Sequence, residues 1–167
     1  MGIVVGIDGS TNKTGIAVFC DGRYIKHTLI DLHKVKDINE RIPKMIGEIC
    51  KYIDSINPDK ILMEETVLSS NTDTLKKLAY LAGGVMFYTY EHGIEFELVL
   101  PSQWRKKIGL QQSNKVKREV LKQESILAVK QEYGLDVNDD IADALLLARS
   151  AFDLPQIVIT EDDLWGT

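Results

Sequence analysis

Cysteine, histidine and long apolar runs are all scarce in this sequence of 167 residues. Cys20 and Cys50 lack C-x-x-C spacing, so we expect reduced core thiols rather than a disulfide or a redox centre. The three histidines, His27, His33 and His92, are scattered, which argues against a zinc site. No apolar run approaches the roughly 20 residues that span a membrane, and no signal-peptide pattern opens the chain. We therefore expect a soluble, cytoplasmic protein without membrane partners.

Positive charge is also in deficit overall, yet it is concentrated in one segment. The net charge is −5, with 20 Lys and Arg against 25 Asp and Glu, which by itself argues against nucleic-acid binding. Residues 104–122, however, read WRKKIGLQQSNKVKREVLK and contain Glu119 as their only acidic residue. Such a basic segment favours contacts with phosphate groups, with a solvated helix face as the alternative.

The length and ordinary composition fit one domain over residues 1–167, with a short acidic tail at about 153–167. Apolar runs predict the strands, and apolar residues at helical spacing predict the helices. Asp21-Gly22 predicts a hairpin turn, and Asn57-Pro58 predicts the end of a helix. We predict strands at residues 3–8, 14–20, 23–31, 60–65 and 95–100, and helices at residues 38–56, 72–92, 113–133 and 139–152.

This order of elements predicts an α/β fold built on a mixed sheet. The first three strands are expected to form an antiparallel meander, and the later strand–helix–strand crossover adds parallel strands. We expect the helix at 72–92 to be capped by Asn71 or Thr72, and the helix at 113–133 to begin at Ser113 or Asn114.

Acidic residues stand where several of these elements end. Asp8 ends the first strand, and Glu64 and Glu65 end the fourth. Because neighbouring side chains of a strand face opposite ways, only one of the two glutamates can share a face with Asp8. Asp140 and Asp143 are three residues apart on a helix and so lie on one face. Burying these carboxylates together would be costly unless a divalent cation such as Mg²⁺ bound them.

Each acidic residue also has an alternative explanation. Asp8 could form a turn, and the two glutamates after the fourth strand could be solvated. Asp139 and Asp140 could cap a helix N-terminus. Asp143, however, interrupts the apolar segment IADALLLA, where capping does not explain a charge. The coincidence of all three sites at element ends therefore favours a shared function.

Four motifs in this order and spacing, GIDGSTNKTGIAVF, LMEETVLSSNTDTLKKL, PSQWRKKIGLQQSNKVKREV and DDIADALLLA, resemble the RuvC family of Holliday-junction resolvases. The resemblance spans roughly residues 1–150. It implies an RNase H-like fold, with a five-stranded mixed sheet flanked by helices. It also implies an endonuclease that resolves four-way and other branched DNA by paired symmetric nicks, leaving a 5′-phosphate and a 3′-hydroxyl.

The resemblance assigns roles to residues of this chain. The family's metal-binding carboxylates match Asp8, Glu64, Asp140 and Asp143, with Glu65 as the alternative to Glu64. It implies two Mg²⁺ ions per site, for which Mn²⁺ can substitute. Lys117 or Arg105 is the candidate for stabilising charge that develops at the phosphate. The DNA-binding residues that it implies are Arg105, Lys106, Lys107, Lys115, Lys117 and Arg118.

The family resemblance also suggests a homodimer built on the helix at 72–92, which carries Gly83-Gly84. Packing of these glycines against the protein's own sheet is the alternative.

One departure from the family pattern is Val67, since the family has an aromatic residue three positions after the strand-end glutamate. Loss of this stacking platform predicts a looser sequence preference. The compact size would suit a phage-encoded member, acting in a bacterial or phage-infected host cytoplasm.

Three other functions stay open. DGSTNKTG also resembles the first phosphate loop of sugar kinases and actin-like ATPases, which need two such domains and a longer chain. An RNase H-like nuclease of the ribosomal RNA processing type would act on RNA, but usually lacks the basic PSQWRK segment. A non-cleaving junction-binding module would keep the fold without needing all four carboxylates.

Overall fold

The computed structural model describes residues 2–67, 71–111 and 116–166. These residues form five strands and six helices. The first three strands follow one another along the chain, and helices then alternate with the last two strands. In chain order they are β1 (Ile3–Asp8), β2 (Lys13–Cys20), β3 (Arg23–Asp31), α1 (Ile38–Ile56), β4 (Lys60–Glu64), α2 (Thr72–Glu91), β5 (Glu95–Val99), α3 (Pro101–Ile108), α4 (Arg118–Tyr133), α5 (Asp139–Arg149) and α6 (Glu161–Trp165).

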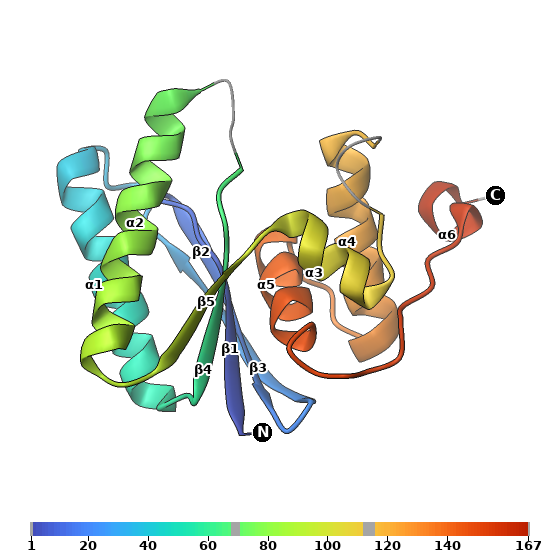
Figure 1. Cartoon of the computed structure of the whole chain (residues 1–167). Helices are drawn as coiled ribbons and strands as arrows, with labels where there is room; N and C mark the ends of the chain where they lie inside the picture. Colours follow the sequence, from blue (N-terminus) through green and yellow to red (C-terminus); the bar gives the residue numbers. More distant parts are fainter. Residues whose placement is uncertain (1, 68–70, 112–115, 167) are drawn as a thin grey trace.

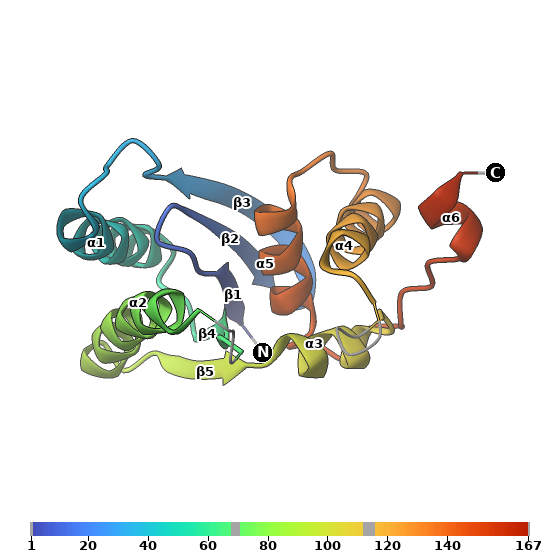
Figure 2. The same ribbon diagram turned by 90° about the horizontal axis from the view of Figure 1, so that it is seen from above.

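The strands form one mixed sheet in the order β3-β2-β1-β4-β5. β1 pairs antiparallel with β2, and β2 with β3, whereas β1–β4 and β4–β5 are parallel pairs. Figure 1 shows α1 and α2 on one face of this sheet and α3, α4 and α5 on the other, and Figure 2 shows the same two layers from above. The predicted α/β fold with a five-stranded mixed sheet is confirmed.

Local sequence signals explain most element ends. Asp21 and Gly22 both have positive φ, as the tight β2–β3 hairpin requires. α1 ends at Ile56 and is capped by Asn57, whose left-handed backbone (φ 51°) lets its N–H donate to the Ile53 carbonyl. Asn71 caps α2 by accepting hydrogen bonds from the backbone N–H groups of Asp73 and Thr74. These predictions are confirmed to within a residue or two.

The region between β5 and α5 differs from the prediction. α4 begins only at Arg118, and Val116 and Lys117 before it are not helical. The fully buried positions of α4 start at Glu124, and Lys117 and Arg118 at its start are exposed. Ser113 and Asn114, the predicted starting residues, lie outside the described residues. The helix predicted at 139–152 ends at Arg149, and α3 and α6 were not predicted.

Alternation along the strands divides the core into two layers. Val4, Ala17 and Leu62 belong to the cluster that packs under α3, α4 and α5, whereas Val5 and Ile61 belong to the cluster under α1 and α2. Among the described residues, no helix combines the length and apolarity needed to cross a membrane.

Glycine lets α5 lie close to the sheet. A Cβ atom on Gly6 of β1 would stand 2.2 Å from the Ala144 carbonyl oxygen, and one on Gly15 of β2 would stand 2.2 Å from the Asp140 carbonyl oxygen. Both contacts are with backbone, which cannot rotate away. The α5 backbone therefore rests directly on two glycines, and this contact fixes where its acidic residues lie.

Replacing Gly6 with alanine should destabilise the protein by about 1–3 kcal/mol or more, because α5 must move to admit the methyl group. Urea denaturation followed by circular dichroism measures the change. Gly47 in α1 is the matched control, since a Cβ there meets nothing within 4 Å. Gly47→Ala should be neutral or raise stability by up to about 1 kcal/mol. Equal stability of the two variants would contradict the packing role of Gly6.

Candidate active site

Strand register selects the carboxylates that face α5. Ile7 of β1 pairs with Met63 of β4 in parallel register, so Asp8 and Glu64 are the next neighbours on adjacent strands. Val4, Gly6 and Asp8 alternate onto the α5 face of β1, as Leu62 and Glu64 do on β4. Glu65 follows the end of β4, where its backbone N–H donates to the Val99 carbonyl over 2.9 Å. Glu64 therefore shares the face of Asp8.

The N-terminal half of α5 brings Asp140 and Asp143 to the strand ends that carry Asp8 and Glu64. Gly15, which lies against the Asp140 carbonyl, is also the cross-strand partner of Asp8. Asp143 follows one turn later on the same face. The cap of α5 is Asn138, whose side chain accepts from the Ile141 N–H. Capping is thus performed by another residue, and Asp140 and Asp143 are left free for the cavity.

A cavity of about 800 Å³ joins these elements. Asp8 and Glu64 approach it from the sheet, α5 provides Asp140 and Asp143, and the start of α4 provides Arg118. The wall on the α1 and α2 side includes Arg41 and Lys77, and the remaining polar lining comes from Ser10, Thr11, Asn12, Glu65, Thr66, Thr74, Arg105, Lys122 and Asp139.

Burial and mutual repulsion raise the pKa values of the four carboxyl groups. Desolvation, followed by the charge of Glu64, holds the pKa of Asp8 well above its usual range. Desolvation and Asp143 raise the pKa of Glu64 to about 7. Desolvation raises the pKa of Asp143 to about 6, and desolvation with Asp139 raises that of Asp140. Together the four carboxyl groups carry more negative charge than the neighbouring positive side chains balance, which favours the binding of a cation.

The donor set fits hard divalent cations. All four groups offer carboxylate oxygens, and Oδ1 of Asp143 is buried without a hydrogen-bond partner among the described residues. Within residues 2–67, 71–111 and 116–166, no three acidic, histidine or cysteine side chains surround one common ion position. The carboxylates share a cavity, and side-chain rotations would be needed to close them around an ion.

Arg105 is placed differently from the sequence expectation of DNA contact. Its side chain is only 4% exposed. Its guanidinium donates to the Gln111 carbonyl over 2.6 Å, to Ser125 Oγ over 2.8 Å and to the carboxylate of Glu124. Because buried acceptors occupy these donors, Arg105 lines the cavity from within the core and is not an exposed surface cation.

The other predicted basic residues separate into two groups. Lys106 and Lys107 are exposed on α3, and Arg118 is exposed on α4. Arg118 lines the cavity, and its charge lowers the pKa values of Glu64 and Asp140. Lys117 is the exposed N-cap of α4 and does not line the cavity. Lys115 lies outside the described residues.

Sequence reasoning missed the side chains that support the carboxylates. Trp104 donates from Nε1 to Glu64 Oε2 over 2.9 Å. Glu124 and Ser125 bind Arg105, and Lys122 pairs with Asp139. Pro101 at the first helical position, with buried Trp104 and Ile108 four apart, is a signal that could have revealed α3. Charged neighbours hid this pattern, and nothing in the sequence reveals the partner of the indole.

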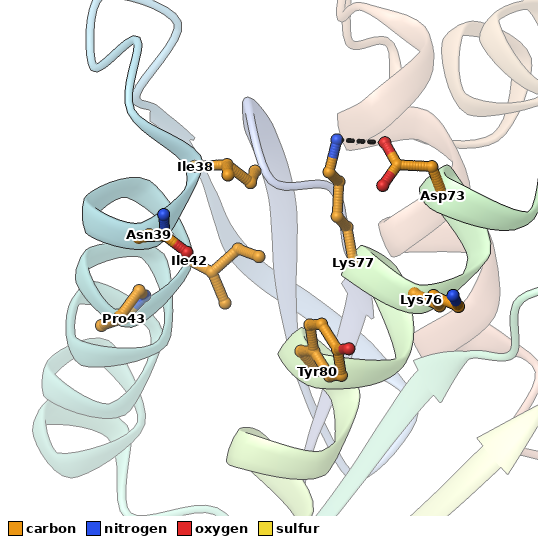
Figure 3. A pocket seen from close by; sticks show the side chains of 8 residues that line it. All are labelled: Ile38, Asn39, Ile42, Pro43, Asp73, Lys76, Lys77 and Tyr80. Carbon is orange, nitrogen blue, oxygen red and sulfur yellow. Dashed lines mark hydrogen bonds and ion pairs between the residues drawn. The ribbon is translucent and has the colours of Figure 1, made fainter.

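A second cavity, of about 350 Å³, lies between α1 and α2 (Figure 3). Ile38 and Ile42 face it from α1, and Tyr80 and Lys77 face it from α2, with Lys77 paired to Asp73. Tyr80 also begins an exposed aromatic face of α2 that continues with Phe87 and Tyr90, which are 66% and 80% exposed. Tyr80, Phe87 and Tyr90 do not line the carboxylate cavity, and this exposed face has the apolar character of a protein contact.

Comparison with known proteins agrees with this geometry. The family model described as Crossover junction endodeoxyribonuclease RuvC matches residues 4–150. Relatives with that description include one from Bifidobacterium animalis subsp. lactis (strain AD011), 27% identical over 87% of this chain and 77% of its own, and one from Ehrlichia ruminantium (strain Welgevonden), 30% identical over 85% and 93%. The solved structure of T. thermophilus RuvC in complex with Holliday junction substrate is 18% identical, covers 90% of this chain and 92% of its own, and has a TM-score of 0.70. At that identity the likeness concerns the fold alone.

Without metal, the protein should lose stability as the pH rises from about 4.5 to about 7. Glu64 and Asp143 bind their protons more tightly when folded, with pKa values of about 7 and 6, than in the unfolded chain, so the native state binds more protons across this window. Asp8→Asn removes one repelling charge and should stabilise the metal-free protein at pH 8 by roughly 1–3 kcal/mol. Thermal melting in EDTA measures both effects.

The matched control for that experiment is Asp153→Asn, at an exposed position outside the cavity. It should follow wild type at every pH. A wild-type stability that stays level or increases between pH 4.5 and 7, with Asp8→Asn no more stable than the control, would contradict the repulsion.

Proposed function

Because the chain belongs to the RuvC family of crossover junction endodeoxyribonucleases, we propose that it resolves four-way DNA junctions by metal-dependent hydrolysis. Paired symmetric nicks would leave a 5′-phosphate and a 3′-hydroxyl. The observation that carries the proposal is the meeting of Asp8, Glu64, Asp140 and Asp143 in one cavity that the exposed Arg118 of α4 also lines. The T. thermophilus relative binds a Holliday junction, as its structure records.

The four carboxylates are the proposed ligands of two Mg²⁺ ions, for which Mn²⁺ can substitute. When bound, such a pair lowers the pKa of water and neutralises charge on the phosphate. The raised pKa values support this assignment, since a bound cation favours the ionised form of every group in the cluster. Glu64 is preferred to Glu65 as the strand ligand because its charge, with that of Asp143, acts on Asp8.

The chain's basic residues would bind and orient the DNA. Lys106 and Lys107 on α3 are exposed, and Arg118 lines the cavity. These cations would hold phosphates near the carboxylates without carrying sequence information. Arg118 lines the cavity and is a candidate to stabilise charge at the reacting phosphate, and Lys117 stays a candidate that would have to reach in from the N-cap of α4.

Val67 supports a broad substrate range. It is 58% exposed and lines the cavity just beyond Glu64, at the place expected for a stacking aromatic residue. An aliphatic side chain offers bases no flat surface, so unpaired bases would be held less selectively. We propose a loose sequence preference and activity on other branched DNA, in the cytoplasm.

The proposed active form is a homodimer, because a four-way junction offers two symmetric strands to cut. The exposed aromatic face of α2 supports this arrangement. Tyr80, Phe87 and Tyr90 lie on one side of the helix, and a Cβ on Gly83 between them would meet nothing within 4 Å. An apolar stripe around an open glycine allows two copies of α2 to approach closely.

Asp143→Asn should reduce junction cutting by at least about 10²-fold, because losing a ligand removes several kcal/mol of charge stabilisation. Binding should persist. The measurement uses a labelled four-way junction with Mg²⁺ or EDTA, and Asp153→Asn should cut like wild type. Junction binding by wild type without cutting would establish a non-cleaving module. Cutting of structured RNA in preference to junctions would establish the RNA-directed alternative.

Phe87→Glu should convert the dimer to a monomer, because each interface would then bury two facing charges. Analytical ultracentrifugation at micromolar concentration measures the mass. Val158→Glu is the matched control, since Val158 is 69% exposed and lies outside α2. The control should remain dimeric. A monomeric wild type, or a dimeric Phe87→Glu variant, would contradict the proposed interface.

A further inference from the structure

Trp104 is a buried residue whose only polar atom is directed at the cavity carboxylates. The side chain of this α3 residue is 1% exposed, and Nε1 donates to Glu64 Oε2 over 2.9 Å. The two residues are 40 positions apart in the chain. An indole has a single donor and no freedom to rotate within a packed core, so this hydrogen bond fixes one rotamer of Glu64.

Arg105, the next residue, acts on a second carboxylate. Its Nη1 lies 4.0 Å from Asp143 Oδ1, the oxygen that lacks a hydrogen-bond partner among the described residues. Ser125, which accepts from Nη1 of Arg105, also hydrogen-bonds the side chain of Asp143 and lowers its pKa. One turn of α3 thus contacts carboxylates from both β4 and α5.

The buried charge of Arg105 is balanced by Glu124 of α4. Glu124 of α4 accepts from the guanidinium and from the Gln111 N–H, and both charged side chains are at most 4% exposed. The Arg105 guanidinium carbon also lies 5.2 Å from the centre of the Trp104 ring. Because Glu124 compensates the buried cation, Arg105 can orient Asp143 without replacing a metal ion as its counter-charge.

We propose that Trp104 and Arg105 are positioning residues, through which α3 holds Glu64 and Asp143 in the orientations that bind divalent cations. The proposal rests on the proposed function only in taking these carboxylates as cation ligands. Groups that hydrogen-bond a ligand from behind usually change metal affinity when removed, even though they never touch the ion. A residue that merely filled the core would be replaced by phenylalanine without this effect.

The test compares Trp104→Phe with Trp165→Phe, which changes the chain's other tryptophan. Trp165 is 67% exposed in α6, at the edge of the molecule (Figure 1). Calorimetric titration with Mn²⁺ in the absence of DNA should show affinity about 10- to 100-fold weaker in Trp104→Phe. Trp165→Phe should match wild type. Junction binding in EDTA should be equal in all three proteins, and higher Mg²⁺ should partly restore cutting by Trp104→Phe.

A second substitution separates positioning from packing. β-(3-Benzothienyl)alanine at position 104 keeps the shape of the indole and replaces its N–H with sulfur, so it should reproduce the weak Mn²⁺ affinity even if Trp104→Phe loosens the core. Wild-type Mn²⁺ affinity in this variant, or no Mn²⁺ binding by wild type, would overturn the proposal. Weakened Mn²⁺ binding in a protein that cuts no junction would support the positioning role and refute the proposed function instead.

Discussion

The burial of like-charged carboxylates is the constraint on which the rest of this structure depends. Desolvation opposes the ionisation of Asp8, Glu64 and Asp143, repulsion from other carboxylates adds to it, and each group has a raised pKa. Such an arrangement reduces the stability of the bare protein at neutral pH. It becomes favourable when a divalent cation supplies the missing positive charge, so the fold and its proposed cofactor are energetically linked.

The scaffold resists this repulsion with contacts that leave little freedom. Parallel pairing of β1 and β4 puts two carboxylates on neighbouring strand ends. Gly6 and Gly15 let the α5 backbone rest against the sheet, which brings Asp140 and Asp143 to the same strand ends. On the far side, α3 and α4 close the cavity with a compensated Arg105–Glu124 pair and the indole of Trp104. Strand pairing and the close contact of α5 with the sheet keep the charges together.

The sequence predicted what depends on local pattern. Alternation and helical spacing gave the sheet and most helix ends, and alternation also restricted the choice to one of Glu64 and Glu65. It could not decide between them, because that requires the register of β1 against β4. The burial of Arg105 could not be foreseen for a related reason, because it depends on the packing of α3 on α4. Trp104 and Glu64 are 40 residues apart, and no local signal reveals their hydrogen bond.

Anomalous diffraction from crystals grown with Mn²⁺ would show whether the four carboxylates bind metal. We expect two Mn²⁺ peaks about 4 Å apart, between Asp8 and Glu64 of the sheet and Asp140 and Asp143 of α5. The indole of Trp104 should still donate to Glu64. Crystals that bind Mn²⁺ only at other residues, with the four carboxylates remaining without an ion, would contradict the assignment of these carboxylates as metal ligands.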